Sequence, residues 1–88
     1  DHYWDKKEEL AKQEFIDMEF HGELDTLISV SRGVRIEFMD SSSILLGTEG
    51  ISLRGQVHHG DSIIKFKGDS GYAIITKDKV HFFIDAYW

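Results

Sequence analysis

The stretch Ile16-Asp17-Met18-Glu19-Phe20-His21 decides the fold class, because apolar and polar residues alternate strictly along it. Successive side chains of a β-strand point to opposite faces of the sheet, so this pattern predicts a strand with one buried and one solvated face. An amphipathic helix would repeat its apolar residues about every 3.6 positions instead. The chain from residue 16 onward is therefore expected to be β-structure.

The same two-residue alternation returns along the rest of the chain, interrupted by glycine, serine and aspartate clusters typical of turns. In the segment 62–67 it predicts that Ile64 and Phe66 point inward and that Lys65 and Lys67 point outward. The short connections favour antiparallel hairpins. The predicted strands are 16–21, 26–31, 34–38, 44–46, 51–57, 62–67, 72–76 and 80–88.

The N-terminal segment 1–14 is predicted to be a short helix, because Asp5 and Glu8 have the spacing of a capping box and good helix formers follow. A chain of 88 residues suits a single domain, 1–88, in which residues 15–88 form an antiparallel β meander. The predicted fold is mainly β (α+β): a short N-terminal helix followed by a seven- or eight-stranded antiparallel β-sandwich or small barrel.

The net charge of −6 is concentrated at one end of the chain. Residues 1–25 hold nine acidic and three basic residues, whereas the remaining residues hold seven of each. Without a basic patch, binding to nucleic acid or to an anionic membrane surface is not expected. The absence of cysteine excludes disulfides and thiolate metal sites. No cofactor is expected, the compartment stays open, and a bacterial or phage origin suits a cysteine-free chain.

The last predicted strand is apolar on both faces, which is typical of a strand covered on both sides or exposed at an interface. The leading hypothesis is therefore a small acidic non-enzymatic protein-binding module, such as an inhibitor, an immunity-type protein or an assembly subunit. Acidic residues near the N-terminus would steer a basic partner, and C-terminal aromatic residues would supply buried contacts. The candidate partner-binding residues are Glu8, Glu9, Glu14, Phe83, Tyr87 and Trp88. The first alternative is a homo-oligomeric structural protein joined through the C-terminal strand.

A second alternative is a small-ligand or metal-binding β-barrel, in which His58, His59 and Asp61 supply imidazole and carboxylate ligands. We favour a solvated turn there, because adjacent residues of a strand point to opposite faces. Catalytic patterns are weak. Asp17 and Glu19 suit a solvated strand face, and the serines at 41–43 and Ser70 lack the strand-to-helix elbow of a hydrolytic nucleophile. We therefore predict that the protein is not an enzyme.

Overall fold

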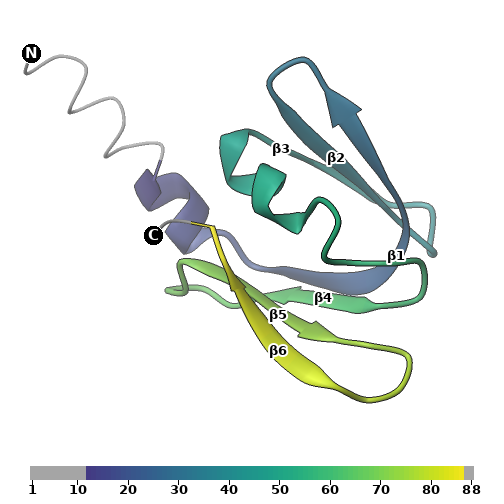
Figure 1. Ribbon diagram of the computed structural model, residues 1–88. Coiled ribbons are helices and arrows are strands. Elements are labelled where there is room, and N and C mark those ends of the chain that lie inside the picture. The colour runs from purple at the N-terminus through teal and green to yellow at the C-terminus, as the bar shows by residue number, and fades with distance from the viewer. Residues whose placement is uncertain (1–11, 87–88) are drawn as a thin grey trace, which may run out of the picture.

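The computed structural model of the protein describes residues 12–86, in which one helical turn at residues 12–17 precedes an antiparallel β-sheet (Figure 1). Its six strands are hydrogen-bonded in the order β3-β2-β1-β4-β5-β6. A 3₁₀ helix, η1 (Thr48–Leu53), lies between β3 and β4 in the chain. The strands are β1 (Phe20–Val30), β2 (Gly33–Phe38), β3 (Ser43–Leu46), β4 (Ser62–Lys65), β5 (Gly71–Ile75) and β6 (His81–Asp85).

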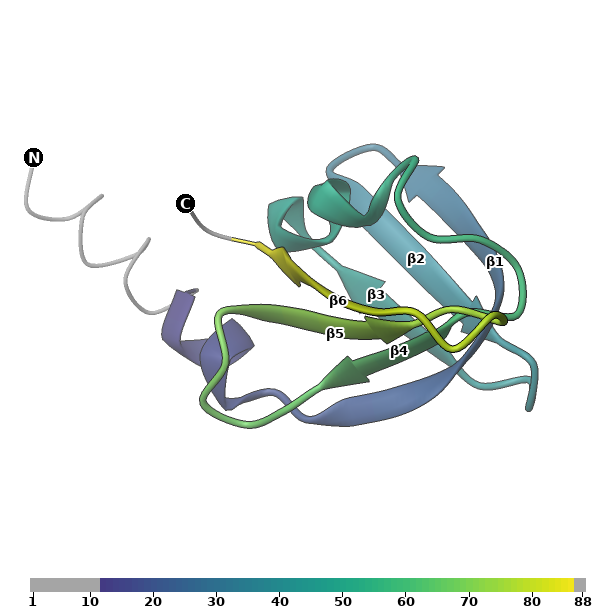
Figure 2. The ribbon, with the colours of Figure 1, turned by 60° about the horizontal axis from the view of Figure 1, so that its bottom comes forward.

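Strand β1 holds the two halves of the sheet together. Its first residues, Phe20 to Glu23, pair with β4, and the part from Leu24 to Val30 pairs with β2. The register shifts between Leu24 and Thr26, which is the signature of a β-bulge. A bulge bends its strand and increases the local twist. The sheet consequently curves, and its two halves face each other across the core (Figure 2).

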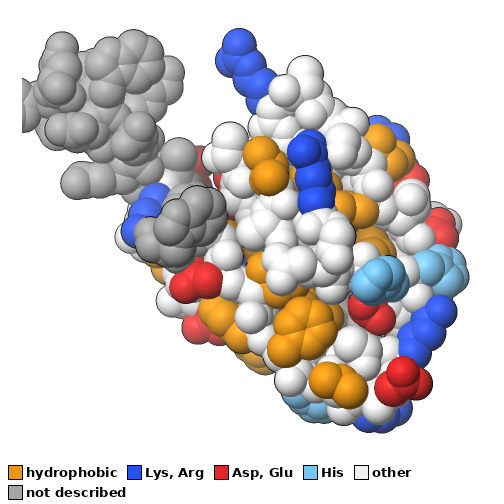
Figure 3. All heavy atoms as spheres, in the orientation of Figure 1, with side chains coloured by type: hydrophobic (Ala, Val, Ile, Leu, Met, Phe, Trp, Pro, Cys, Tyr) orange, Lys and Arg blue, Asp and Glu red, His pale blue; other side chains and the backbone are white. Residues whose placement is uncertain are grey.

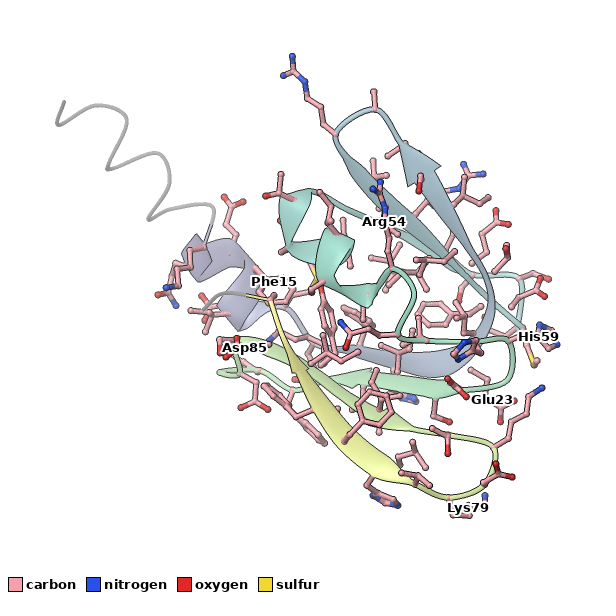
Figure 4. The ribbon with its side chains drawn as sticks, in the orientation of Figure 1. Phe15, Glu23, Arg54, His59, Lys79 and Asp85 are labelled. Atoms are coloured by element: carbon pink, nitrogen blue, oxygen red, sulfur yellow. The ribbon has the colours of Figure 1, made fainter. Side chains whose placement is uncertain are left out.

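The core lies inside this curved sheet and is completed by the two short helical segments. Phe15 of the helical turn contacts the Tyr72 ring edge-on, with 5.4 Å between ring centroids (Figure 4). The Tyr72 hydroxyl donates a 2.8 Å hydrogen bond to the carbonyl oxygen of Glu49 in η1. Other buried hydrophobic residues come from both halves of the sheet, from η1 and from the segments after η1 and β6: Leu24, Val34, Ile36, Phe38, Leu46, Leu53, Val57, Ile63, Ile74, Ile84 and Ala86.

The prediction of a mainly antiparallel β fold is confirmed, whereas the sandwich or barrel and the count of seven or eight strands are not. Within residues 12–86 the sheet is open and has six strands. The predicted strand 16–21 is wrong for residues 16–19, because residues 16 and 17 are helical and β1 begins only at Phe20. The predicted strand 26–31 lies in the same long strand, which ends at Val30. The predicted strand 51–57 is wrong: η1 and turns occupy this segment, and Gly55 has a φ of +74°, outside the strand region.

The end of the predicted N-terminal helix also differs. Residues 1–11 of the predicted helix 1–14 lie outside the described residues, and the described turn, which buries Phe15 in the core, continues to residue 17. The predicted meander, in which each strand pairs with the next one along the chain, is wrong at one connection. Strand β4, which follows η1, pairs with β1 and not with β3. Strand β1 is 11 residues long, so it can pair with β4 along its first part and with β2 along the rest.

The facing of β4 is opposite to the prediction. Lys65 is fully buried, and Phe66, which directly follows the strand, is 53% exposed. The Lys65 ammonium donates hydrogen bonds from Nζ to the carbonyl oxygens of Ile16 (3.0 Å), Met18 (3.1 Å) and Phe66 (2.6 Å). It also lies 5.0 Å from the centroid of the Phe15 ring, at cation–π distance. These contacts satisfy the charge inside the domain.

The ammonium of Lys65 thus binds carbonyl groups at the C-terminal end of the helical turn, where helices leave carbonyls without partners and favour positive charge. Burial lowers the pKa of Lys65, and the carboxylates of Asp69 and Asp17 partly offset this by raising it. Lys65 therefore ties the helical turn to β4. No helix in the described part of the chain is both long and apolar enough to cross a membrane.

Candidate functional site

The surface that stands out is the side of β4, β5 and β6 that points away from the core, which we call the outer face. Antiparallel registers place Ile64 opposite Ala73, and Ala73 opposite Phe83. The same registers place Ser62 opposite Ile75. Because side chains alternate along each strand, these residues share the face opposite to buried Ile63, Tyr72 and Ile74.

The outer face is apolar at its centre. Phe66 and Phe83 are each about half exposed, and Ile64, Ala73 and Ile75 between them are partly exposed. An open groove runs along this face, and its lining includes Ile64, Phe66 and Ile75 together with His21 and Glu23 of β1. A small monomeric domain seldom exposes neighbouring aromatic and aliphatic side chains on one face of its sheet unless that face is an interaction site.

Charged and polar groups border this apolar centre. Glu23 of β1 is exposed at one border of the outer face. Asp85, the last residue of β6, is exposed at the opposite border (Figure 4). Asp85 accepts a 3.1 Å hydrogen bond from the Ser70 hydroxyl, which holds its carboxylate at the margin. His21 and His81 occupy outer-face positions on the same two strands. The arrangement is an apolar centre between two acidic margins.

The structure places the predicted partner-binding residues unevenly. Phe83 lies on the outer face at 51% exposure, and Glu14 is exposed on the helical turn. The other four lie outside the described residues: Glu8, Glu9, Tyr87 and Trp88. The sequence reasoning missed Phe66 and Ile64 because it assigned them to the core side. The apolar pairs Ile63-Ile64 and Ile74-Ile75 were the available signal, since each pair must place one apolar side chain outward.

The candidate metal residues His58, His59 and Asp61 lie in the turn before β4, but the two imidazoles have different carboxylate partners. The His58 N–H donates to Asp61 Oδ2 at 2.9 Å, and the His58 ring Nδ1 lies 3.8 Å from the same oxygen. The His59 ring Nδ1 lies 3.4 Å from Asp25 Oδ1, and its N–H donates to the Asp25 backbone carbonyl oxygen at 2.9 Å (Figure 4). Among residues 12–86, no three His, Asp or Glu side chains are grouped so that they could hold a metal ion.

Asp61 is buried and stabilises this turn, because its carboxylate accepts the His58 N–H and its backbone N–H donates to the His58 carbonyl at 3.0 Å. We expect Asp61→Ala to lower the free energy of unfolding by about 2 kcal/mol, since the His58 backbone N–H then loses a charged acceptor. Urea denaturation measures this loss. Asp78→Ala, in the exposed β5–β6 turn, should change stability by less than about 0.5 kcal/mol. Equal effects of the two substitutions would contradict this role of Asp61.

In the serine cluster at 41–43, Ser41 and Ser42 lie in the turn between β2 and β3, and Ser43 is the first residue of β3. The Ser42 hydroxyl and N–H both donate to the Asp40 carboxylate, and these hydrogen bonds lower the pKa of Asp40. Ser41 has a φ of +74°, a left-handed conformation that suits a tight turn. This is the local bonding of an Asx turn.

No protein-family model, curated protein or solved structure matches this chain.

Proposed function

We propose that the protein is a non-enzymatic protein-binding module that docks its partner on the outer face of β4, β5 and β6. One observation carries the proposal: Phe66 and Phe83, both about half exposed, flank the aliphatic residues Ile64, Ala73 and Ile75 on a single face. Interfaces characteristically bury aromatic side chains at the centre of such patches and keep polar groups at the rim. Covering this face with a partner would remove its apolar surface from water.

The charges around the face favour a basic partner with an apolar centre. Glu23 and Asp85 border the face, and residues 1–25 carry the whole net negative charge of the chain. Complementary charge at a rim mainly raises the association rate and selects among partners. An inhibitor, an immunity-type protein or an assembly subunit could use this surface in the same way.

Photo-crosslinking in the native host tests the proposal. A benzoylphenylalanine residue replaces Phe66 in one variant and Leu45 in a control variant, because Leu45 is also well exposed but lies on β3 at the other edge of the sheet. We expect the residue at position 66 to capture a protein that the residue at position 45 does not. With that protein purified, Phe66→Asp should weaken binding by about tenfold or more, the loss of one interface hot spot, while Leu45→Asp should leave it unchanged. Equal capture at both positions, or unchanged binding by Phe66→Asp, would refute the proposal.

A second candidate function is a homo-oligomer joined through the C-terminal strand. The observation that favours it is the position of β6, which is the last strand of the sheet and carries exposed phenylalanines. Exposed apolar edge strands are templates for pairing with another chain.

A further inference from the structure

The outer edge of β6 presents backbone groups that none of the strands within residues 12–86 pairs with. On the inner edge, the Ala86 N–H donates to the Ser70 carbonyl at 3.0 Å, and the Thr76 N–H donates to the Val80 carbonyl at 2.9 Å. Hydrogen bonding alternates along an antiparallel strand, so the backbone N–H and C=O groups of the even-numbered residues of β6 point toward β5. The backbone N–H and C=O groups of His81 and Phe83 therefore point away from the sheet.

This edge is also apolar and lacks the usual protection. Val80 is 56% exposed, and Phe82 and Phe83 are 37% and 51% exposed, so hydrophobic side chains gather along β6 on the surface drawn in Figure 3. The chain contains no proline, and no lysine or arginine lies within β6. Proteins usually blunt an exposed edge with such residues.

We propose that a second copy of this chain pairs with β6 edge to edge, antiparallel, about a two-fold axis at Phe83. The sequence of β6, His81-Phe82-Phe83-Ile84-Asp85, is complementary to itself in this register. Phe83 lies opposite its own copy, and Phe82 lies opposite Ile84 of the partner subunit. His81 lies opposite Asp85 of the partner subunit, so that the imidazole N–H can donate to a carboxylate.

Charge complementarity selects this register over its neighbours. A two-fold axis perpendicular to the sheet places the outer faces of both copies on the same side. The neighbouring registers therefore have this axis one residue away from Phe83, at Phe82 or at Ile84. The register centred on Phe82 places His81 opposite Phe83 of the partner subunit. The register centred on Ile84 places Asp85 opposite Phe83 of the partner subunit. Each leaves a polar or charged side chain against an aromatic ring. Only the register centred on Phe83 pairs His81 with Asp85, and the symmetry makes that pair twice.

The same self-complementarity identifies the occupant as a second copy and not an unrelated extended peptide. The Asp85 carboxylate already accepts from the Ser70 hydroxyl, and a carboxylate has further acceptor positions for an imidazole N–H. The pairing uses the edge of β6 and shares Phe83 and Asp85 with the outer face, while Phe66, Ile64 and Ile75 stay uncovered. It is tested separately from docking on that face because Phe66 takes no part in it.

Cysteine trapping tests the pairing and its register, because the natural chain has no cysteine. Opposite residues of an antiparallel pair lie within disulfide reach. We expect Phe83→Cys to form a disulfide dimer at least about tenfold faster than Leu45→Cys, a control on β3 at a position that is even more exposed. An equimolar mixture of His81→Cys and Asp85→Cys should give the mixed disulfide well above its random share. Equal rates at 83 and 45, or a random share of the mixed dimer, would overturn the proposal.

Charge exchange gives a second test that does not require a disulfide. His81→Asp places two carboxylates opposite each other at both symmetric positions, so sedimentation velocity should show dimerisation weakened by about tenfold or more. The double variant His81→Asp with Asp85→His restores the opposite pairs and should recover most of the loss. Phe66→Asp should leave dimerisation unchanged, which separates this proposal from docking on the outer face. A double variant as weak as His81→Asp alone, or a chain that stays monomeric at high concentration, would refute the pairing.

Discussion

Lys65→Met is expected to lower the free energy of unfolding by about 3 kcal/mol, a large part of the stability of a small domain. Methionine keeps the length of the side chain but removes the ammonium. The carbonyl oxygens of Ile16, Met18 and Phe66 then lose the donor that each has at 3.1 Å or less. The Ile16 and Phe66 carbonyls keep the backbone N–H groups of Gly68 and Asp69 as donors. The expected loss therefore comes from three hydrogen bonds to a charged donor, which contribute more than neutral ones. Urea denaturation of the two proteins measures the difference.

The control is Lys67→Met, because Lys67 is exposed in the β4–β5 turn two residues away. It should change stability by less than about 0.5 kcal/mol. Lys65→Met should also release the helical turn at residues 12–17, which amide hydrogen exchange detects as faster exchange there. If Lys65→Met is as stable as wild type, the buried ammonium does not hold the turn on the sheet.

The same lysine predicts a pH dependence. Burial lowers the pKa of Lys65 in the folded protein, while the unfolded chain keeps the ordinary value near 10.5. Between these two values the unfolded chain binds more protons, so the stability of the folded state rises with pH. Lys65→Met lacks this group. The stability difference between wild type and Lys65→Met should therefore widen as pH rises through the window just below 10.5.

Gly33→Ala is expected to be about as damaging as Lys65→Met, with a loss of about 3 kcal/mol, because no side chain can move to make room. A Cβ atom at Gly33 would lie 2.0 Å from the Leu46 carbonyl oxygen and 2.9 Å from the Gly47 Cα. Both are backbone atoms at the place where β2 begins beside the end of β3. Relief therefore requires the two strands to separate. Thermal or urea denaturation measures the loss.

Gly47→Ala is the matched control for Gly33→Ala. Its Cβ would first meet the Glu49 carboxylate at 3.1 Å, and that group lies at the end of a flexible side chain. The expected change is below about 1 kcal/mol. Equal losses from the two substitutions would show that the close contact between β2 and β3 is not what requires glycine at position 33.

Alternation along the chain was sufficient to predict the strand-rich antiparallel fold, because the buried set follows a period of two in β2 and β5. It failed where tertiary contacts outweigh the local pattern. In the segment 51–57, Leu53 and Val57 reach the core from a 3₁₀ helix and a turn, so their apolar character did not require a strand. The bulge in β1 that joins two predicted strands depends on pairing with β2 and β4, which no local pattern encodes.

The candidate site depended on a single face assignment. The segment Ile63-Ile64-Lys65-Phe66 has apolar residues on both faces, so alternation alone could not decide which face was buried. The preference of lysine for water suggested that Lys65 points outward. The carbonyls of the helical turn, distant in sequence, reverse that preference. The two-sided apolar pattern of the last strand left open whether Phe83 is covered or exposed, and the structure shows it 51% exposed.

The facing of β4 is the claim on which both the stability argument and the proposed docking surface depend, and nuclear Overhauser spectroscopy of the unmodified protein tests it most directly. The account predicts contacts between the Lys65 side-chain methylenes and the Phe15 ring, together with upfield shifts of those methylenes by the ring current. It also predicts no contact between the Phe66 ring and the buried rings of Phe15 and Tyr72. Contacts from the Phe66 ring to those core rings, with Lys65 showing none, would contradict it.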